Sequence, residues 1–153
     1  MHIVINIDSQ TLSFHSNDFT KQYAISTSKN GIGQEFSSFK TPIGEHFIIE
    51  KSGENAPNNA YFKNRVPVGL INNNYKNEDY IVARVLRLSG CVNGLNLNSD
   101  CDSYKRMIYI HASHPLANLT KPSSLGCIRM YAKDICELFE LVTIGCKVFI
   151  YEK

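Results

Sequence analysis

The chain contains no long apolar run and no block of basic residues. A membrane-spanning helix needs about 20 consecutive, mostly apolar residues, and no such stretch occurs among the 153 residues. The net charge is only +2, and the scattered lysines and arginines are not interleaved with aromatic residues, which argues against nucleic-acid binding. The first residues have neither a basic start nor a long apolar segment. The sequence therefore predicts no signal peptide and no membrane span.

Paired metal-ligand motifs are also scarce. The five cysteines show no C-x-x-C spacing, and their odd number leaves at least one thiol outside any pairing within one molecule; they are Cys91, Cys101, Cys127, Cys136 and Cys146. An H-x-x-H pattern joins His111 to His114, but Pro115 follows at once, so no helix places both rings on one face. We predict no metal and no cofactor.

Length and composition describe an ordinary soluble globular protein. Hydrophobic residues make up 43% and charged residues 20% of the chain. A chain of this length buries about two thirds of its unfolded surface without staples. The sequence predicts a single domain over residues 1–153 and leaves the oligomeric state open.

Short β-favouring runs dominate the pattern, which predicts a mainly β fold. Candidate strands are residues 3–7, 11–15, 22–26, 46–51, 80–88, 106–110 and 147–152, and residues 52–60 and 72–78 are polar enough to be loops. Ile135, Leu138, Phe139 and Val142 follow the spacing of an amphipathic helix, with Asp134 in its first turn and Gly145 placed to help end it.

The residues around Cys127 suggest thiol chemistry. Gly126 allows a sharp turn and a close approach of substrate to the backbone. Arg129 is two residues away, and positive charge lowers the pKa of a thiol. We expect a reactive thiolate here, although a buried structural cysteine has the same local composition.

His111 follows the apolar run 106–110. A histidine at the end of a strand has a fixed position, and a nucleophilic cysteine needs such a base to accept its proton and later protonate the leaving amine. A core histidine is the alternative. The two residues together favour a Cys127 and His111 pair.

These residues resemble the L,D-transpeptidase catalytic domain family of the YkuD type. The resemblance lies in Ile110-His111, then Ser124-Leu125-Gly126-Cys127-Ile128-Arg129-Met130. Gly31-Ile32-Gly33-Gln34, Lys40-Thr41-Pro42-Ile43-Gly44, Asp102-Ser103 and Gly145 also match. Ala112 stands where the family usually has glycine, and Leu125 where many members have a second histidine.

The resemblance implies an antiparallel β-sandwich or distorted barrel carrying one or more short helices. It also implies attack on the L,D peptide bond of a peptidoglycan tetrapeptide stem, with Cys127 as nucleophile, His111 as base and the Ala112 carbonyl orienting the imidazole. Backbone N–H groups near Gly126 and Cys127 would stabilise the oxyanion. Ser124 and Leu125 would line the substrate site.

Arg129 has two roles open to it at the site, anchoring the loop or a substrate carboxylate, and a plain internal salt bridge is the alternative. For the whole protein, an L,D-carboxypeptidase or another stem-peptide hydrolase would use the same Cys-His pair. A non-catalytic envelope-binding module is a further alternative. The family implies the cell envelope or periplasm, whereas the missing signal peptide keeps the cytoplasm open.

Cys91 and Cys101 bracket a short loop ahead of the histidine strand. In an oxidising envelope a disulfide between them would contribute on the order of 2–4 kcal/mol. Two reduced thiols are the alternative.

Overall fold

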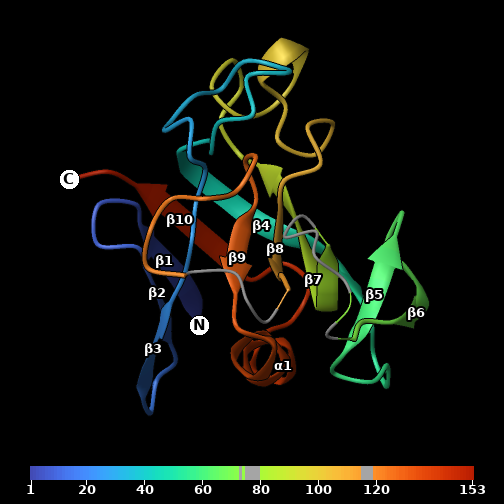
Figure 1. Cartoon of the computed structure of the whole chain (residues 1–153). Helices are drawn as coiled ribbons and strands as arrows, with labels where there is room; N and C mark the ends of the chain where they lie inside the picture. Colours follow the sequence, from blue (N-terminus) through green and yellow to red (C-terminus); the bar gives the residue numbers. More distant parts are fainter. Residues whose placement is uncertain (73, 75–79, 115–118) are drawn as a thin grey trace.

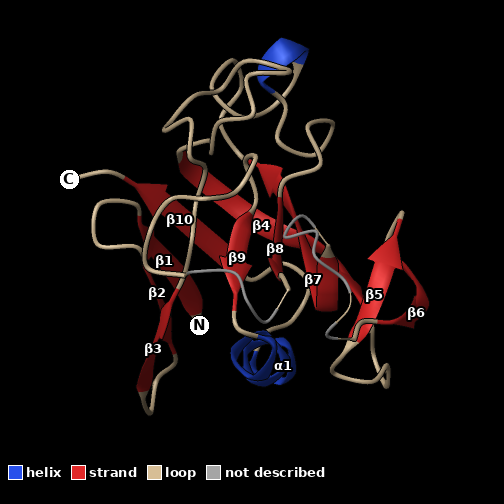
Figure 2. Cartoon of the chain, viewed as in Figure 1, coloured by secondary structure: helices blue, strands red, loops and turns tan. Residues whose placement is uncertain are grey.

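The computed structural model describes residues 1–72, 74, 80–114 and 119–153. Its elements are short strands, one α-helix and one 3₁₀ helix within those ranges (Figures 1 and 2). In chain order they are β1 (His2–Asn6), β2 (Thr11–His15), β3 (Thr20–Ala24), β4 (Gly44–Ser52), β5 (Ala60–Lys63), β6 (Val66–Leu70), β7 (Ile81–Gly90), η1 (Ser99–Cys101), β8 (Tyr109–Ala112), β9 (Ile128–Met130), α1 (Ala132–Leu141) and β10 (Lys147–Tyr151).

The strands form one curled, mixed sheet. Its order is β3-β2-β1-β10-β4-β7-β5-β6, and β8 lies on the other edge of β7 with β9 beside it. The pairs β1 with β10 and β8 with β9 are parallel, whereas β4 and β7 pair antiparallel through a bulge. The sheet is therefore mixed but mainly antiparallel, as predicted, because the other strand pairs are antiparallel.

Two backbone hydrogen bonds close this sheet on itself. Just after β3, Ser26 exchanges N–H···O bonds of 2.9 Å with Arg129 in β9. The path from β3 through β10 and β7 to β9 thus returns to its start, and the β5 and β6 hairpin projects from the ring (Figure 1). The mainly β, distorted-barrel prediction is confirmed.

The inside of the barrel is filled by alternate side chains of the strands and by one face of α1. Ile3 and Ile5 in β1 are fully buried, as period-two alternation requires. Ile135, Leu138 and Phe139 complete the same core from the helix, as their spacing predicts. No helix in the described ranges is long and apolar enough to cross a membrane.

The C-terminal end of α1 is held by a lysine. Lys51 in β4 donates to the carbonyl oxygens of Phe139 and Val142 at 2.6 and 2.7 Å, where the helix dipole favours a cation. Gly145 lies in the turn before β10, and its N–H donates to the Ile48 carbonyl at 2.7 Å. The expectation that Gly145 ends the helix is therefore wrong.

Most predicted strands are present, with shifted ends, but the strand at 106–110 is misplaced. Met107 has a φ of 55°, a left-handed conformation incompatible with a strand, so β8 begins only at Tyr109. His111 consequently lies within the strand. The loop predicted at 52–60 is essentially correct, and that at 72–78 lies mostly outside the described residues.

The β5 and β6 hairpin was not predicted at all. Asn64 and Arg65 form its tight turn, with φ values of 49° and 65°. Positive φ at both central positions defines the type I′ turn, whose twist matches that of the two flanking strands. Asparagine adopts positive φ readily and is common in this turn. Every residue of β6 is exposed.

The predicted disulfide is absent. Cys91 and Cys101 are both free thiols. Cys101 Sγ donates to the Asn98 carbonyl at 3.1 Å inside its own turn, and Cys91 is exposed. The local turn geometry of η1 thus directs the Cys101 thiol to a backbone acceptor.

Candidate active site

The parallel pairing of β8 and β9 brings the predicted cysteine and histidine together. Ile110 pairs with Ile128, and His111 pairs with Arg129. Because alternate residues of a strand face the same side, His111, Arg129 and Cys127, which immediately precedes β9, share one face. One surface pocket is lined by Ile81, His111, Ser124, Leu125, Cys127 and Arg129.

His111 is buried, with 4% of its surface exposed. Its Nδ1 lies 2.6 Å from the carbonyl oxygen of Ala112. A carbonyl only accepts, so Nδ1 carries the proton and Nε2 is the nitrogen able to take up another. The backbone of Ala112 makes this contact, so the alanine side chain does not alter it.

The Cys127 thiol is half-buried beside the start of β8. The Tyr109 N–H donates to Sγ at 3.4 Å, and the thiol donates to the Met107 carbonyl at 3.5 Å. Burial raises the pKa of the thiol to about 11, although the Tyr109 N–H and the charges of Arg129 and Arg106 act in the opposite direction. The resting thiol is therefore protonated at neutral pH, and the expectation of a lowered pKa was wrong.

Gly126 and Ser124 shape the loop that carries the thiol. Gly126 has a φ of 121°, and a Cβ there would lie 3.3 Å from the Lys40 carbonyl, so only glycine fits without strain. Ser124 Oγ donates to the Cys127 carbonyl at 2.6 Å and accepts the Gly126 N–H at 3.2 Å. Thr41 Oγ1 donates to the Gly126 carbonyl at 3.0 Å.

One arginine holds this loop, and a second holds the neighbouring segment that contains Gly33 and Lys40. Arg129 Nη1 donates to both the carbonyl and the hydroxyl of Ser123 at 3.3 Å, which is the loop contact expected for one of its roles. Arg106 donates to the carbonyls of Lys40 at 2.6 Å and Gly33 at 3.1 Å. Sequence reasoning missed Arg106, because it assigned this residue to a strand.

A second pocket of about 330 Å³ adjoins the first across Ile81, Leu125 and Cys127. Arg65, at the tip of the hairpin, lines this second pocket together with Arg106 and Tyr109. The available sequence signal was Asn64 at the turn, because asparagine tolerates the positive φ that a two-residue hairpin turn requires.

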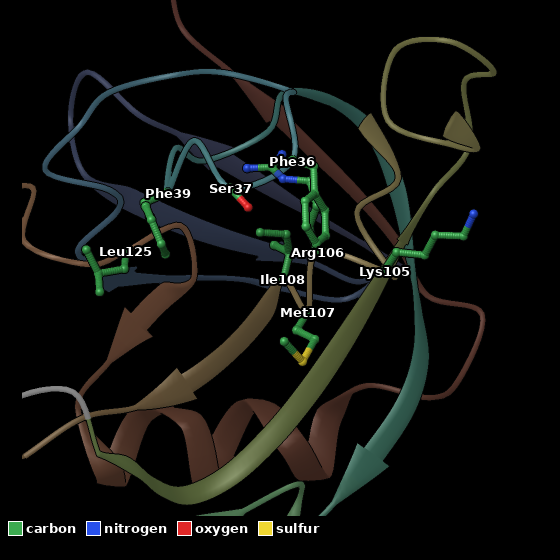
Figure 3. A pocket seen from close by; sticks show the side chains of 8 residues that line it. All are labelled: Phe36, Ser37, Phe39, Lys105, Arg106, Met107, Ile108 and Leu125. Atoms are coloured by element: carbon green, nitrogen blue, oxygen red, sulfur yellow. The ribbon is translucent and has the colours of Figure 1, made fainter. Parts of the chain in front are cut away.

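A third pocket continues the hollow beyond Arg106 and Met107, which it shares with the second. Exposed Phe36 and Phe39 rings and the Lys105 side chain line it (Figure 3). The three pockets together make an extended cleft with Cys127 between the first and the second.

The fold is that of solved L,D-transpeptidase structures. The Mycobacterium smegmatis L,D-transpeptidase is 15% identical, with a TM-score of 0.56 over 97% of this chain and 57% of that chain. L,D-transpeptidase 3 from Mycobacterium tuberculosis is 16% identical, with a TM-score of 0.58 over 98% and 60%. A cysteine-to-serine mutant of the Enterococcus faecium L,D-transpeptidase is 14% identical, with a TM-score of 0.58 over 98% and 49%.

The chain thus spans about half to three fifths of the length of these solved structures. The family model of the L,D-transpeptidase catalytic domain, YkuD, matches residues 1–150. The chain belongs to this family. No curated protein sequence matches it.

Proposed function

We propose that the chain is a cysteine-dependent L,D-transpeptidase acting on peptidoglycan tetrapeptide stems, with Cys127 as nucleophile and His111 as base. The observation that carries the proposal is the pairing of β8 with β9, which puts both side chains into one pocket. The Ala112 carbonyl holds the tautomer that leaves Nε2 basic. Peptidoglycan as substrate follows from the family.

The first half-reaction forms a thioester. His111 Nε2 takes the thiol proton as Sγ attacks the carbonyl carbon of the third stem residue. The resulting oxyanion accepts a hydrogen bond from the Cys127 N–H, because the Gly126 N–H already donates to Ser124. One such donor typically contributes about 2.7–4 kcal/mol of barrier lowering. When the C–N bond breaks, the imidazolium protonates the amine of the departing D-alanine.

The second half-reaction releases the enzyme. The amine of another stem, deprotonated by His111, attacks the thioester carbon and makes a cross-link between two third-position residues. Water in its place makes a tripeptide, which is the carboxypeptidase outcome. This proposal assigns the protein to the cell envelope, where its substrate lies.

The high pKa of Cys127 fits proton transfer during attack. A thiol with a pKa of about 11 is a strong nucleophile once deprotonated, and His111 lies in the same pocket. The resting thiol is protonated, and His111 takes up its proton during the attack. A preformed thiolate is not required.

Defined stem peptides test the proposal. The protein is incubated with a tetrapeptide or a pentapeptide stem, with and without an amine acceptor, and products are identified by mass. We expect D-alanine release from the tetrapeptide and none from the pentapeptide. Cleavage of the pentapeptide D,D bond with the tetrapeptide untouched would contradict the assignment.

A β-lactam probe separates an enzyme from a silent module. A relative, L,D-transpeptidase 3 of Mycobacterium tuberculosis, is described in complex with a faropenem-derived adduct. We expect faropenem to add mass at Cys127 here and to leave a Cys127→Ser variant unmodified. Cys146, a buried thiol, serves as the internal control. Unmodified wild-type protein would favour the binding module.

A further inference from the structure

Among the described residues, the lining of the second pocket beside Cys127 has two cations and no anion. Arg65 and Arg106 are its charged lining residues. The Arg106 guanidinium is directed to the carbonyls of Lys40 and Gly33, which are dipoles and leave its charge in place. The field in this pocket is therefore positive, and it favours an anionic group of a bound substrate.

Of these two arginines, Arg65 is the one whose guanidinium still has donors available for an anionic ligand. Its Nε lies 3.1 Å from a Glu50 carboxylate oxygen, and its Nη1 donates to the Tyr109 hydroxyl at 3.2 Å. Nη2 has no hydrogen-bond partner among the described residues, and the side chain is 30% exposed. The guanidinium is thus held at Nε and Nη1, and its Nη2 donors remain available.

Glu50 does not neutralise this site. The same carboxylate also accepts from Arg87 Nη1 at 3.3 Å and from the Tyr104 hydroxyl at 3.0 Å. Two guanidiniums therefore share one carboxylate, and the cluster keeps a net positive charge. Held in this way, Arg65 loses little side-chain entropy on binding an anion.

Tyr109 sets the distance between Arg65 and the thiol. Its backbone N–H contacts Cys127 Sγ, and its hydroxyl contacts Arg65. Tyr109 therefore lies between the Arg65 guanidinium and Cys127 Sγ and contacts both of them. Arg65 and Cys127 line the same pocket, and an extended peptide advances about 3.3–3.6 Å per residue, so we place the group that Arg65 binds within a few residues of the scissile bond.

From this geometry we infer that Arg65, at the tip of the β5 and β6 hairpin, binds a free carboxylate of the substrate next to the scissile bond. This inference rests on the proposed function and identifies Arg65 as the residue that selects the substrate. The carboxylate has two possible sources, the terminal carboxylate of the departing residue or a side-chain carboxylate of the third stem residue. Recognition of the terminal one would also reject a pentapeptide, whose carboxylate lies one residue further out.

Three tetrapeptides distinguish these sources. One is unmodified, one has an amidated C-terminus and one has an amidated side-chain carboxylate at the third residue. For one of the two amidated peptides we expect the wild-type kcat/KM to be about 10- to 100-fold lower than for the unmodified peptide. This is the range of a lost hydrogen bond between charged groups. The Arg65→Gln variant should cleave that amide and the unmodified peptide at similar rates.

Loss of discrimination separates binding from structural support. A purely structural Arg65 would lower cleavage of all three peptides in Arg65→Gln by the same factor, and that outcome would overturn the inference. Lys63→Gln, an exposed cation of the same hairpin outside the pocket, should keep the wild-type ratios. Wild-type cleavage of every peptide at one rate overturns the inference and leaves the proposed function standing.

A small-reagent test works even if no stem peptide is cleaved. Iodoacetate and iodoacetamide alkylate the same sulfur and differ in one negative charge. We expect the rate with iodoacetate divided by the rate with iodoacetamide, both at Cys127, to fall in Arg65→Gln. The same ratio should stay unchanged in Lys63→Gln. Equal ratios in wild type and Arg65→Gln would contradict an anion site here, whatever the substrate of the protein.

Discussion

The loop that carries Cys127 and the β5 and β6 hairpin face the same cleft but are built differently. The loop is fixed by backbone contacts, among them those of Ser124 and Thr41 with its carbonyl oxygens. The hairpin exposes all of β6, and two polar contacts of Arg65 link its tip to the cleft.

This difference separates two tasks. Positioning a nucleophile requires accuracy well below 1 Å, which many short contacts supply. Selecting a substrate requires only that a charge be held within reach. Substitutions in the loop should therefore affect reaction rate, whereas those in the hairpin should affect choice of substrate.

The largest effect is expected at His111. Replacement by alanine removes the base, and acylation by the tetrapeptide should slow by roughly 10²–10⁴-fold, the usual contribution of a positioned acid–base group. Stopped reactions followed by mass spectrometry measure it. His15 in β2 is a suitable control, and an unimpaired His111→Ala protein would direct attention to His114.

Acid should destabilise the fold through His46 in β4, which is fully buried. Burial lowers the pKa of His46 to about 4, while its Nε2 lies 2.9 Å from Ser103 Oγ. The unfolded chain protonates this residue at its ordinary pKa of about 6.5. The free energy of unfolding should therefore fall by up to about 3 kcal/mol between pH 6.5 and 4.

Urea unfolding at several pH values measures this slope. A His46→Gln variant should lose most of it, whatever its stability at pH 7. A variant with the same slope as wild type would show that other groups cause the acid sensitivity. A matched Cys127→Ser protein should keep the slope, because the wild-type thiol that it lacks stays protonated throughout this range and contributes nothing to it.

Adding a methyl group at Gly126 tests the loop directly. The positive φ and the nearby Lys40 carbonyl should make Gly126→Ala cost about 1–3 kcal/mol of stability and lower kcat. Gly94 also has a positive φ but no atom within 4 Å of a built Cβ. Gly94→Ala thus controls for backbone strain alone, and an equal loss of kcat in both variants would refute a role for the close contact.

The smallest effects distinguish the two regions most finely. Thr41→Val removes the donor to the Gly126 carbonyl and should cost about 1 kcal/mol with a measurable fall in kcat. Val68→Ser on exposed β6 should change stability by less than about 0.5 kcal/mol. Thermal unfolding and steady-state rates check both. A larger rate loss in Val68→Ser than in Thr41→Val would reverse the comparison.

Sequence reasoning found the pair Cys127 and His111 because a glycine turn, an apolar strand and the family pattern all mark them. It found α1 because its buried positions repeat with helical spacing. It missed β6 because an edge strand exposed along its whole length shows no alternation, and Pro67 within it also weakens the strand signal.

The start of β8 and the pKa of Cys127 depend on tertiary structure. Nothing in the sequence marks Met107 for a positive φ. The pKa reflects burial by residues distant in the chain, which outweighs the charge of Arg129, evident from the sequence, and that of Arg106, which only the fold brings near. Arg65 was missed for the same reason, since only the folded hairpin brings it to the cleft.

We propose above all that the Cys127 thiol becomes acylated by a tetrapeptide stem. The most direct measurement mixes protein and tetrapeptide, quenches with acid within one turnover, and maps the modified peptide by mass. We expect an adduct on Cys127 equal in mass to the stem without its terminal D-alanine, and none in Cys127→Ala. Product formed by a wild-type protein with no adduct, or with the adduct on another cysteine, would contradict it.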